Sequence, residues 1–298
     1  MKPSRWFATI LLPLFFAAVA HAGEETPTKA GTVTLKQVTA AFQAADHKKV
    51  VELVAQVPAD APDAPKFRYL AGESLLVLGR PADAEAELRA VLATRPKAVP
   101  ALVALGRALS LVGNHDEAVE TLRRATTEDP TDVAARRALG EALLLAGQTE
   151  EGTKVLEAAL EAAPNDPATV RAFVEARIRA EDLSGALAAA EKLAKAQPKH
   201  PMGKFLVAVV LDRQDTDEGA IAAYEKALLL DPAFLDAHKN LAILCHVKSN
   251  TYQDQARVKK AFAHYEKYFE LGGSDARLKQ MYDTMKAYFE QNPGAPGR

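Results

Sequence analysis

The chain has 298 residues, of which 37 are lysine or arginine and 39 are aspartate or glutamate, so its formal net charge is −2 at pH 7. Nonspecific binding to nucleic acid needs a strongly basic surface, and this balance argues against a nucleic-acid partner. Cys245 is the single cysteine, which excludes an intrachain disulfide, and we interpret it as a small buried apolar residue.

Residues 1–22 predict a cleaved signal peptide. Lys2 and Arg5 precede a short apolar stretch, and an Ala-His-Ala sequence ends it before Gly23, which is the pattern that a signal peptidase reads. Without the two basic residues the mature chain carries 35 basic and 39 acidic side chains, a net charge of −4. We therefore expect a periplasmic or secreted protein with no membrane span in its mature chain. Residues 23–31 are small and polar and predict a flexible lead-in.

A fixed sequence period organises most of the remaining chain. Six prolines recur at every thirty-fourth position without insertion or deletion, at Pro62, Pro96, Pro130, Pro164, Pro198 and Pro232. Small residues recur in two further sets, at Gly72, Gly106, Gly140, Ala208 and Ala242, and at Ala84, Ala118, Gly152, Ala186 and Ala220. Such a period predicts a stacked array of helix–turn–helix units in an all-α fold.

The array begins with a degenerate unit and continues with regular ones. Residues 32–64 keep the apolar spacing, but Val38 and Val50 stand where small residues are expected. Terminal units often depart from the pattern because one of their faces has no neighbour. Residues 65–234 then predict five units of equal length, each one full period long.

The end of the array also departs from the period. Residues 235–273 predict a final unit with a seven-residue insertion in or near residues 249–257, and we expect two additional helical turns to absorb it. Residues 274–291, with Asp275 as N-cap, predict a capping helix that covers the apolar end of the stack. Residues 292–298 predict a disordered tail.

Helix ends are marked inside the units. Asp132 and Asp166 stand where side chains cap the first turn of a helix. Gly113 and Gly147 recur where a residue in the left-handed conformation ends a first helix. We therefore expect each unit to consist of two helices joined by a tight turn.

The motif within one unit resembles the tetratricopeptide repeat. The matching residues are Leu102, Leu105, Gly106 and Leu109, then Ala118 and Leu122, then Pro130. The resemblance extends over roughly residues 32–273. It implies a right-handed superhelical α-solenoid of such repeats, in which a small residue at Gly106 lets the two helices of a unit approach closely and Leu122 fills the space between them.

We find no constellation that predicts an enzyme. The sequence has no glycine-rich phosphate loop, no nucleophile elbow and no HExxH zinc motif. The spacing of His238, His246 and His264 does not match that of metal ligands. The sequence therefore predicts a non-catalytic protein without cofactor or metal.

The resemblance implies that the first helix of each unit lines a concave groove for a partner protein or peptide. Carried onto this chain, the groove would include Tyr69, Val103, Arg107, Arg137, Glu141, Arg171, Glu175, Phe205, Arg213 and Lys239. Arginines beside aromatic and apolar side chains would suit an acidic partner with apolar anchor residues. As an alternative, each arginine that has a glutamate four residues later could be neutralised by it, as Arg137 by Glu141, and the face would then be only a solvated surface.

Two functions follow from this interpretation. The first is a scaffold or adaptor of the bacterial cell envelope that holds a partner in the groove. The second is a periplasmic chaperone or assembly factor for an envelope, secretion, pilus or motility complex. A scaffold would hold a fixed partner, whereas a chaperone would hold many clients for a short time.

Overall fold

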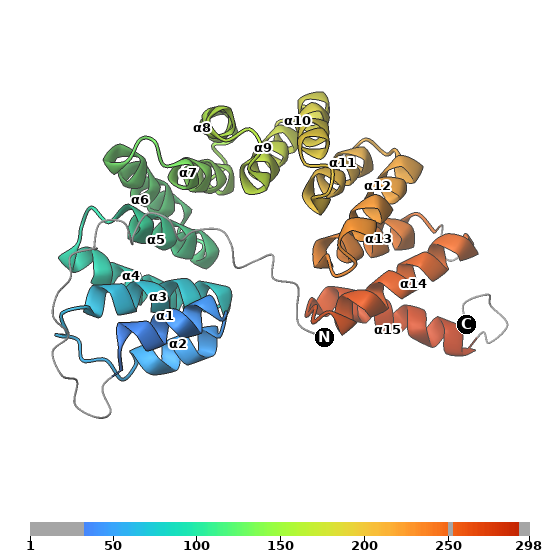
Figure 1. Cartoon of the computed structure of the whole chain (residues 1–298). Coiled ribbons are helices and arrows are strands. Elements are labelled where there is room, and N and C mark those ends of the chain that lie inside the picture. Colours follow the sequence, from blue (N-terminus) through green and yellow to red (C-terminus); the bar gives the residue numbers. More distant parts are fainter. Residues whose placement is uncertain (1–32, 250–252, 292–298) are drawn as a thin grey trace. The chain divides into compact units, whose positions relative to one another are not determined.

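The structure is a computed structural model that describes residues 33–249 and 253–291 (Figure 1). The predicted signal peptide, the lead-in and the C-terminal tail lie outside the described residues. Helices are the only regular secondary structure in the described part of the chain. In order, they are α1 (Leu35–Gln43), α2 (His47–Val54), α3 (Ala64–Val77), α4 (Pro81–Thr94), α5 (Val99–Val112), α6 (His115–Glu128), α7 (Val133–Leu145), α8 (Thr149–Ala162), α9 (Pro167–Arg179), α10 (Leu183–Ala196), α11 (Pro201–Arg213), α12 (Asp217–Leu230), α13 (Leu235–Val247), α14 (Gln255–Glu270) and α15 (Ala276–Gln291).

The helices form two compact units, which are described separately. Unit 1 ends at Val155 and unit 2 begins at Leu156, so the boundary falls inside α8. In unit 1, each helix from α1 to α7 packs on the next, and the first helices α3, α5 and α7 also contact one another in sequence. In unit 2 the same holds from α9 to α15, with α11 in contact with both α9 and α13. Each unit is therefore a stack of helical hairpins.

The predicted caps and turns define the helix ends. The side chain of Asp132 accepts a hydrogen bond from the Ala135 amide at 3.0 Å, and that of Asp166 accepts one from Thr169 at 2.9 Å. These bonds satisfy backbone donors that the first helical turn leaves without partners. Gly113 has φ +98°, in the left-handed region that glycine adopts without strain, and it closes α5 as the sequence predicted.

In the pairs α3–α4 and α5–α6, close approach of the two helices requires glycine at the predicted phase. A Cβ added at Gly106 would lie 2.3 Å from Leu122 Cγ, far inside van der Waals contact. Gly72 stands in the same relation to Leu88, at 2.7 Å. Both leucines are fully buried, so each fills the space that its glycine leaves. The interpretation of this phase is confirmed.

The first pair, α1 and α2, has a small core of its own. Val38 and Val50 are fully buried and pack with Phe67 and Ala71 of α3. The larger valines at these positions are therefore part of the packing against the second pair. Thr34 closes the N-terminus of α1 with a capping box, in which its side chain and that of Gln37 bond each other's backbone amides.

The insertion in the last pair differs from the prediction. α12 begins three residues before Ala220, whereas α14 begins six residues before Ala261, so the helices take up only three of the seven additional residues. The expectation of two more helical turns is wrong. The other additional residues lie between Val247 and Gln255, in the connection that joins α13 to α14.

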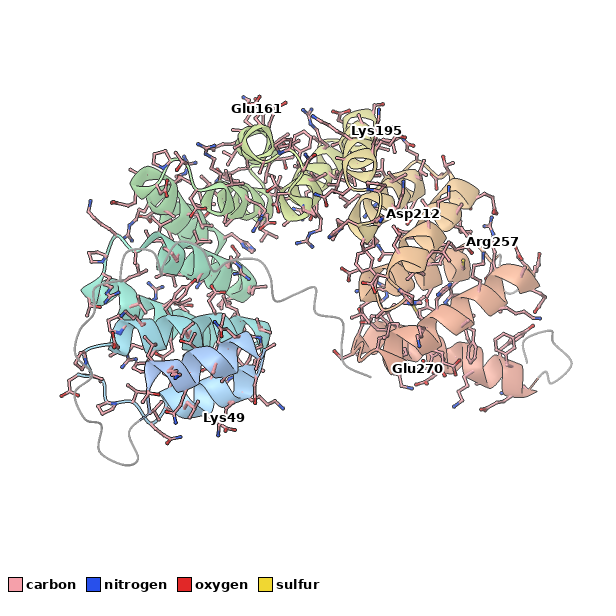
Figure 2. All side chains as sticks on the ribbon, viewed as in Figure 1. Lys49, Glu161, Lys195, Asp212, Arg257 and Glu270 are labelled. Atoms are coloured by element: carbon pink, nitrogen blue, oxygen red, sulfur yellow. The ribbon has the colours of Figure 1, made fainter. Side chains whose placement is uncertain are left out.

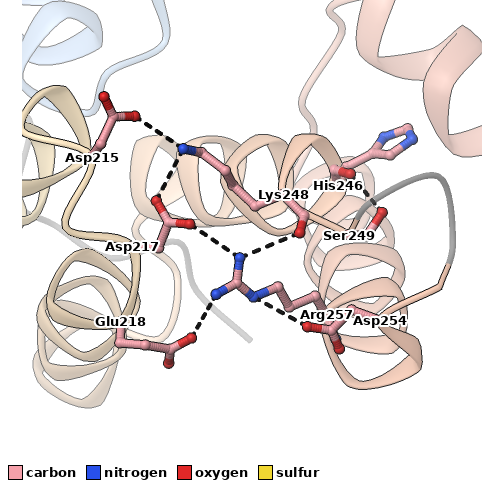
Figure 3. A network of polar contacts seen from close by, with 8 residues as sticks. All are labelled: Asp215, Asp217, Glu218, His246, Lys248, Ser249, Asp254 and Arg257. Atoms are coloured by element: carbon pink, nitrogen blue, oxygen red, sulfur yellow. Dashed lines mark hydrogen bonds and ion pairs between the residues drawn. The ribbon is translucent and has the colours of Figure 1, made fainter.

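Ion pairs hold both ends of this connection against the α11–α12 turn (Figure 3). Lys248 Nζ lies 3.0 Å from Asp215 Oδ1 and 3.2 Å from Asp217 Oδ1. On the other side, Arg257 Nη1 lies 3.1 Å from Asp217 Oδ2 and Arg257 Nη2 lies 2.6 Å from Glu218 Oε1. Asp217 thus bridges the lysine before the insertion and the arginine after it. These side-chain contacts join the described residues on both sides of the insertion to the start of α12.

The C-terminal helix α15 lies on the core of unit 2. Leu278, Met285 and Phe289 are buried in the same cluster as Leu241. Charged side chains such as Lys49 in α2 and Glu270 in α14 stand out from the ribbon (Figure 2).

Cys245 is fully buried in the unit 2 core, and burial raises the pKa of its thiol to about 11. The interpretation of Cys245 as a small apolar residue is confirmed.

Candidate functional site

Each first helix presents the same three positions on one side. Tyr69, Glu73 and Val77 follow one another at intervals of four in α3, so they lie along one face of that helix. We call this face, with its counterparts one and two repeats later, the first-helix face of unit 1. It comprises Tyr69, Glu73, Val77, Val103, Arg107, Leu111, Arg137, Glu141 and Leu145. The first-helix face of unit 2 comprises Arg171, Glu175, Arg179, Phe205, Val209, Arg213, Lys239, Ile243 and Val247.

In unit 1 the predicted arginine is partly neutralised. Arg107 Nη1 lies 3.5 Å from Glu73 Oε2, across the contact between α5 and α3. The Glu73 side chain is only 17% exposed, and burial raises the pKa of its carboxyl group while Arg107 lowers it. Arg107 therefore serves in part to compensate a half-buried carboxylate, which leaves less of its charge for a partner.

Tyr69 is a half-buried neighbour of this ion pair. Burial raises the pKa of its phenol, and the nearby charges of Glu73 and Asp132 act in the same direction. The hydroxyl group is therefore protonated, and neutral, at physiological pH. Val103 is half-buried and packs against the core clusters of unit 1, and Arg137 and Glu141 are half-buried on α7.

The structure adds three residues to this face that the sequence interpretation missed. Val77, Leu111 and Leu145 are 63%, 64% and 44% exposed, although all three are large and apolar. We call them the apolar row. They recur once per repeat at the C-terminal ends of α3, α5 and α7, one helical turn beyond Glu73, Arg107 and Glu141. Their register in the sequence could have identified them, because the core of a helical hairpin does not require apolar residues there.

In unit 2 the same face is more basic. Arg171 is exposed, and within the described residues it forms no ion pair. Glu175, which would neutralise Arg171 under the alternative of a solvated face, accepts a hydrogen bond from Arg179 at 2.8 Å instead. Arg213 is exposed at the C-terminal end of α11, with Asp212 as its neighbour in the chain. Arg171 and Arg213 thus leave guanidinium groups on this face that solvent can reach.

Two predicted members of the unit 2 face serve the fold instead. Phe205 is only 7% exposed, and its ring packs against those of Phe234 and Tyr224, with centroids 4.8 and 5.9 Å apart. It therefore belongs to the core rather than to an exposed aromatic anchor. Lys239 Nζ lies 3.2 Å from Asp275 Oδ2, so it ties α13 to the start of the C-terminal helix.

The histidines of the last pair contact one another and a tyrosine. His238 Nδ1 and His264 Nδ1 are 2.8 Å apart, and His246 Nδ1 lies 3.2 Å from the Tyr265 hydroxyl. Within residues 33–249 and 253–291, no group of three or more histidine, cysteine or carboxylate side chains is placed to hold a metal ion.

Comparison with known families gives one result along most of the chain. Models described as tetratricopeptide repeat match residues 35–99, 69–132, 111–176 and 171–234. Together they span residues 35–234, well over half of the chain. No curated protein was found that matches the chain.

Solved structures of helical repeat proteins share the fold. A chain of the APC/C hetero-tetramer Cut9–Hcn1 is 12% identical with a TM-score of 0.59; the match covers 83% of this chain and 48% of that one, so this chain spans about half its length. TTC0263, a TPR protein from Thermus thermophilus, is 21% identical with a TM-score of 0.55 over 60% of this chain and 98% of that one. The C-terminal part of a TPR protein from Cytophaga hutchinsonii is 16% identical with a TM-score of 0.52 over 83% and 98%. The predicted all-α solenoid is confirmed.

Proposed function

Because the chain belongs to the tetratricopeptide repeat family, whose fold supports protein–protein interaction in general, we propose that it is a non-catalytic scaffold or adaptor of the bacterial cell envelope. It holds a partner protein or peptide on its first-helix faces. Binding is by burial of apolar side chains and by charge pairing on preformed helices, without turnover.

The apolar row of unit 1 is the observation that carries this proposal. An exposed leucine taken singly needs no explanation, but a set of large apolar residues in register on neighbouring helices is an exposed patch. Val77, Leu111 and Leu145 do not fill the core, since all three are at least 44% exposed. Covering them with a partner removes apolar surface from water, at about 25 cal/mol per Å².

The first-helix face of unit 2 supports an acidic partner segment. Arg171 and Arg213 lie on α9 and α11, which contact each other, and neither forms an ion pair within the described residues. A guanidinium group that solvent can reach can bind a carboxylate through two parallel hydrogen bonds. Apolar side chains of a partner would therefore suit the face of unit 1, and acidic side chains would suit the face of unit 2.

The proposed location in the envelope rests on residues 1–22, whose charged, apolar and small-residue regions follow the order of a secretory signal. No helix within the described ranges has the length and apolar character that a bilayer crossing demands. The mature chain would then meet its partner on the far side of the inner membrane. Cell fractionation tests this directly, and a mature protein that retains residues 1–22 and stays in the cytoplasm would contradict it.

A cross-linked pull-down tests the binding face. The wild-type chain is compared with the V77S/L111S/L145S variant, which removes the apolar row, and with L229S/L230S, which removes exposed leucines from α12 in unit 2. We expect the wild type and the α12 control to recover the same partner, and the row variant to recover at least tenfold less at unchanged helicity. Equal recovery by all three proteins would refute the proposed face.

The same experiment addresses the chaperone alternative. The apolar row would also hold exposed apolar segments of immature clients, which have no fixed sequence. A scaffold returns one or a few partners in constant ratio to the bait, whereas a chaperone returns many at low occupancy. If the wild type recovers many proteins and V77S/L111S/L145S loses all of them, the apolar row is still the binding face, but the function is that of a chaperone.

A further inference from the structure

A second apolar site lies on the opposite side of α3. A half-open cavity of about 230 Å³ is bounded by α2, α3, α4 and the connection before α3. Its apolar wall is made by Val54 of α2 and by Phe67, Ala71 and Leu75 of α3. All of this lies within unit 1.

The cavity is separate from the first-helix face. The cavity residues of α3 stand two positions before the residues of the first-helix face on the same helix: Phe67 before Tyr69, Ala71 before Glu73, and Leu75 before Val77. Two residues correspond to about 200° around an α-helix, so the two sets point to nearly opposite sides of α3. A ligand in the cavity therefore leaves the apolar row free.

The repeat register explains why the cavity exists. In the next pair, Leu102 is fully buried, and Leu92 packs against the cluster that contains it. Their counterparts one repeat earlier are Arg68 and Pro58, and both line the cavity. The space is thus the place where two large aliphatic side chains meet one repeat later and do not meet here.

Arg68 is held at the edge of this space by a partner on α4. Its Nη1 donates to Glu87 Oε2 at 3.0 Å, and each of the two side chains is 30% exposed. Thr121, the counterpart of Glu87 in the next pair, is buried. The ion pair therefore replaces a buried Leu–Thr arrangement and keeps polar groups at the mouth of an apolar cavity. A guanidinium group has five N–H donors, so Arg68 can pair with Glu87 and still bind a peptide carbonyl.

We propose that this cavity binds one bulky apolar side chain, preferably aromatic, of a protein partner. The volume decides between classes of ligand: drug-sized molecules and cofactors occupy pockets of about 300–1,000 Å³, whereas a cavity of about 150 Å³ already holds a benzene ring. At about 230 Å³ the site fits one aromatic side chain with its Cβ. The Arg68–Glu87 pair at the mouth offers a donor and an acceptor to the backbone that carries the side chain.

The filling variant R68L/E87T tests this assignment, because it installs the Leu102 and Thr121 arrangement of the next pair. The probes are the capped tripeptides acetyl-Gly-Trp-Gly-amide and acetyl-Gly-Ala-Gly-amide, followed by methyl NMR of Val54 and Leu75 in the full chain. We expect saturable shifts with the tryptophan peptide and none with the alanine peptide. The filled variant should bind at least tenfold more weakly and should melt at or above the wild-type temperature.

The matched control is K97L/E128T, which makes the same two kinds of substitution at an exposed ion pair of unit 1 and leaves the cavity open. It should bind the tryptophan peptide as the wild type does. If the filled variant does not fold, Ala55→Leu at the exposed rim provides a second way to occlude the site. No methyl shifts at millimolar peptide, or equal affinity in the wild type and the occluded variants, would overturn the proposal. Neither result bears on the first-helix face.

Discussion

Acidification should loosen the last helical pair through its two contacting histidines. His238 Nε2 lies 3.1 Å from the Pro232 carbonyl oxygen, so this nitrogen carries a proton and donates it. In neutral His238 the other nitrogen, Nδ1, must then accept from His264 Nδ1–H at 2.8 Å. The contact between α13 and α14 therefore requires at least one neutral ring, and two charged rings would repel each other in place of this bond.

The pKa shifts give the sign of the effect. Burial, the facing His238 and the charge of Lys260 lower the pKa of His264 from 6.5 to about 4, against an opposing effect of Glu225. Burial also lowers the pKa of His238. Because the unfolded state binds these protons at higher pH than the folded state, stability is complete above about pH 6.5 and falls as the pH is lowered from 6.5 towards 4.

The magnitude can be worked out for His264 alone. A shift from 6.5 to about 4 corresponds to roughly 2 kcal/mol of lost stability at pH 5 for a fully shielded group. The ring is half-buried, and solvent screening reduces the expectation to about 1–2 kcal/mol at pH 5. The contribution of His238 has the same sign and adds to it.

Native-state hydrogen exchange measures this locally, which suits a repeat protein whose pairs need not unfold together. After correction for intrinsic exchange rates, the opening free energy of amides in α13 and α14 should decrease when the pH is lowered from 7 to 5. The opening free energy of amides in α9 should stay unchanged. The variant His264→Asn keeps an N–H donor for His238 but cannot titrate, so its pH dependence should be smaller. An equal fall in the variant, or no fall in the wild type, would refute the reasoning.

Three further predictions concern packing, charge and the insertion. Gly106→Ala places a methyl group against the buried Leu122, and we expect a loss of about 1–3 kcal/mol, seen as a lower melting temperature. R137E/R171E should weaken an acidic partner at least tenfold in a binding titration without a change in helical dichroism; unchanged affinity would exclude an arginine-dependent face. Arg257→Met removes the ion pairs that hold the end of the insertion, and faster hydrogen exchange at the start of α14 should follow, by about 1–3 kcal/mol of local stability.

Backbone requirements were readable from the sequence, because they admit few residues. Only a glycine permits the 2.3 Å approach at Gly106, and the left-handed turn at Gly113 favours glycine for a separate reason. Each requirement recurs in successive helical hairpins, so the same residue type appears several times at equivalent positions of the sequence. The caps at Asp132 and Asp166 are equally local, since each bonds an amide three residues later.

Whether a given side chain is exposed, buried or ion-paired was less predictable, because this depends on residues from other repeats. Phe205 has the phase of an exposed groove residue, yet Phe234, at the start of α13, offers an aromatic face that draws its ring into the core. Lys239 is engaged by Asp275, which lies outside the repeat pattern. The exposure of Leu111 is difficult to predict for a different reason: a large apolar residue in a helical repeat usually indicates the core, although the apolar row recurs with the repeat period.

In the proposed function, helix α3 would serve the fold and a partner through different residues. Phe67 and Leu75 are buried and fix the helix, whereas Val77, two residues beyond Leu75, is 63% exposed. Since the two sets lie on nearly opposite sides of the helix, replacing Val77 by serine removes no core contact, and surface substitutions of this kind usually change stability by less than about 0.5 kcal/mol. Partner choice can therefore vary along the apolar row without a cost in folding. A loss of binding in V77S/L111S/L145S with an unchanged melting temperature is what this separation requires, whereas a parallel loss of stability would show that the row supports the stack.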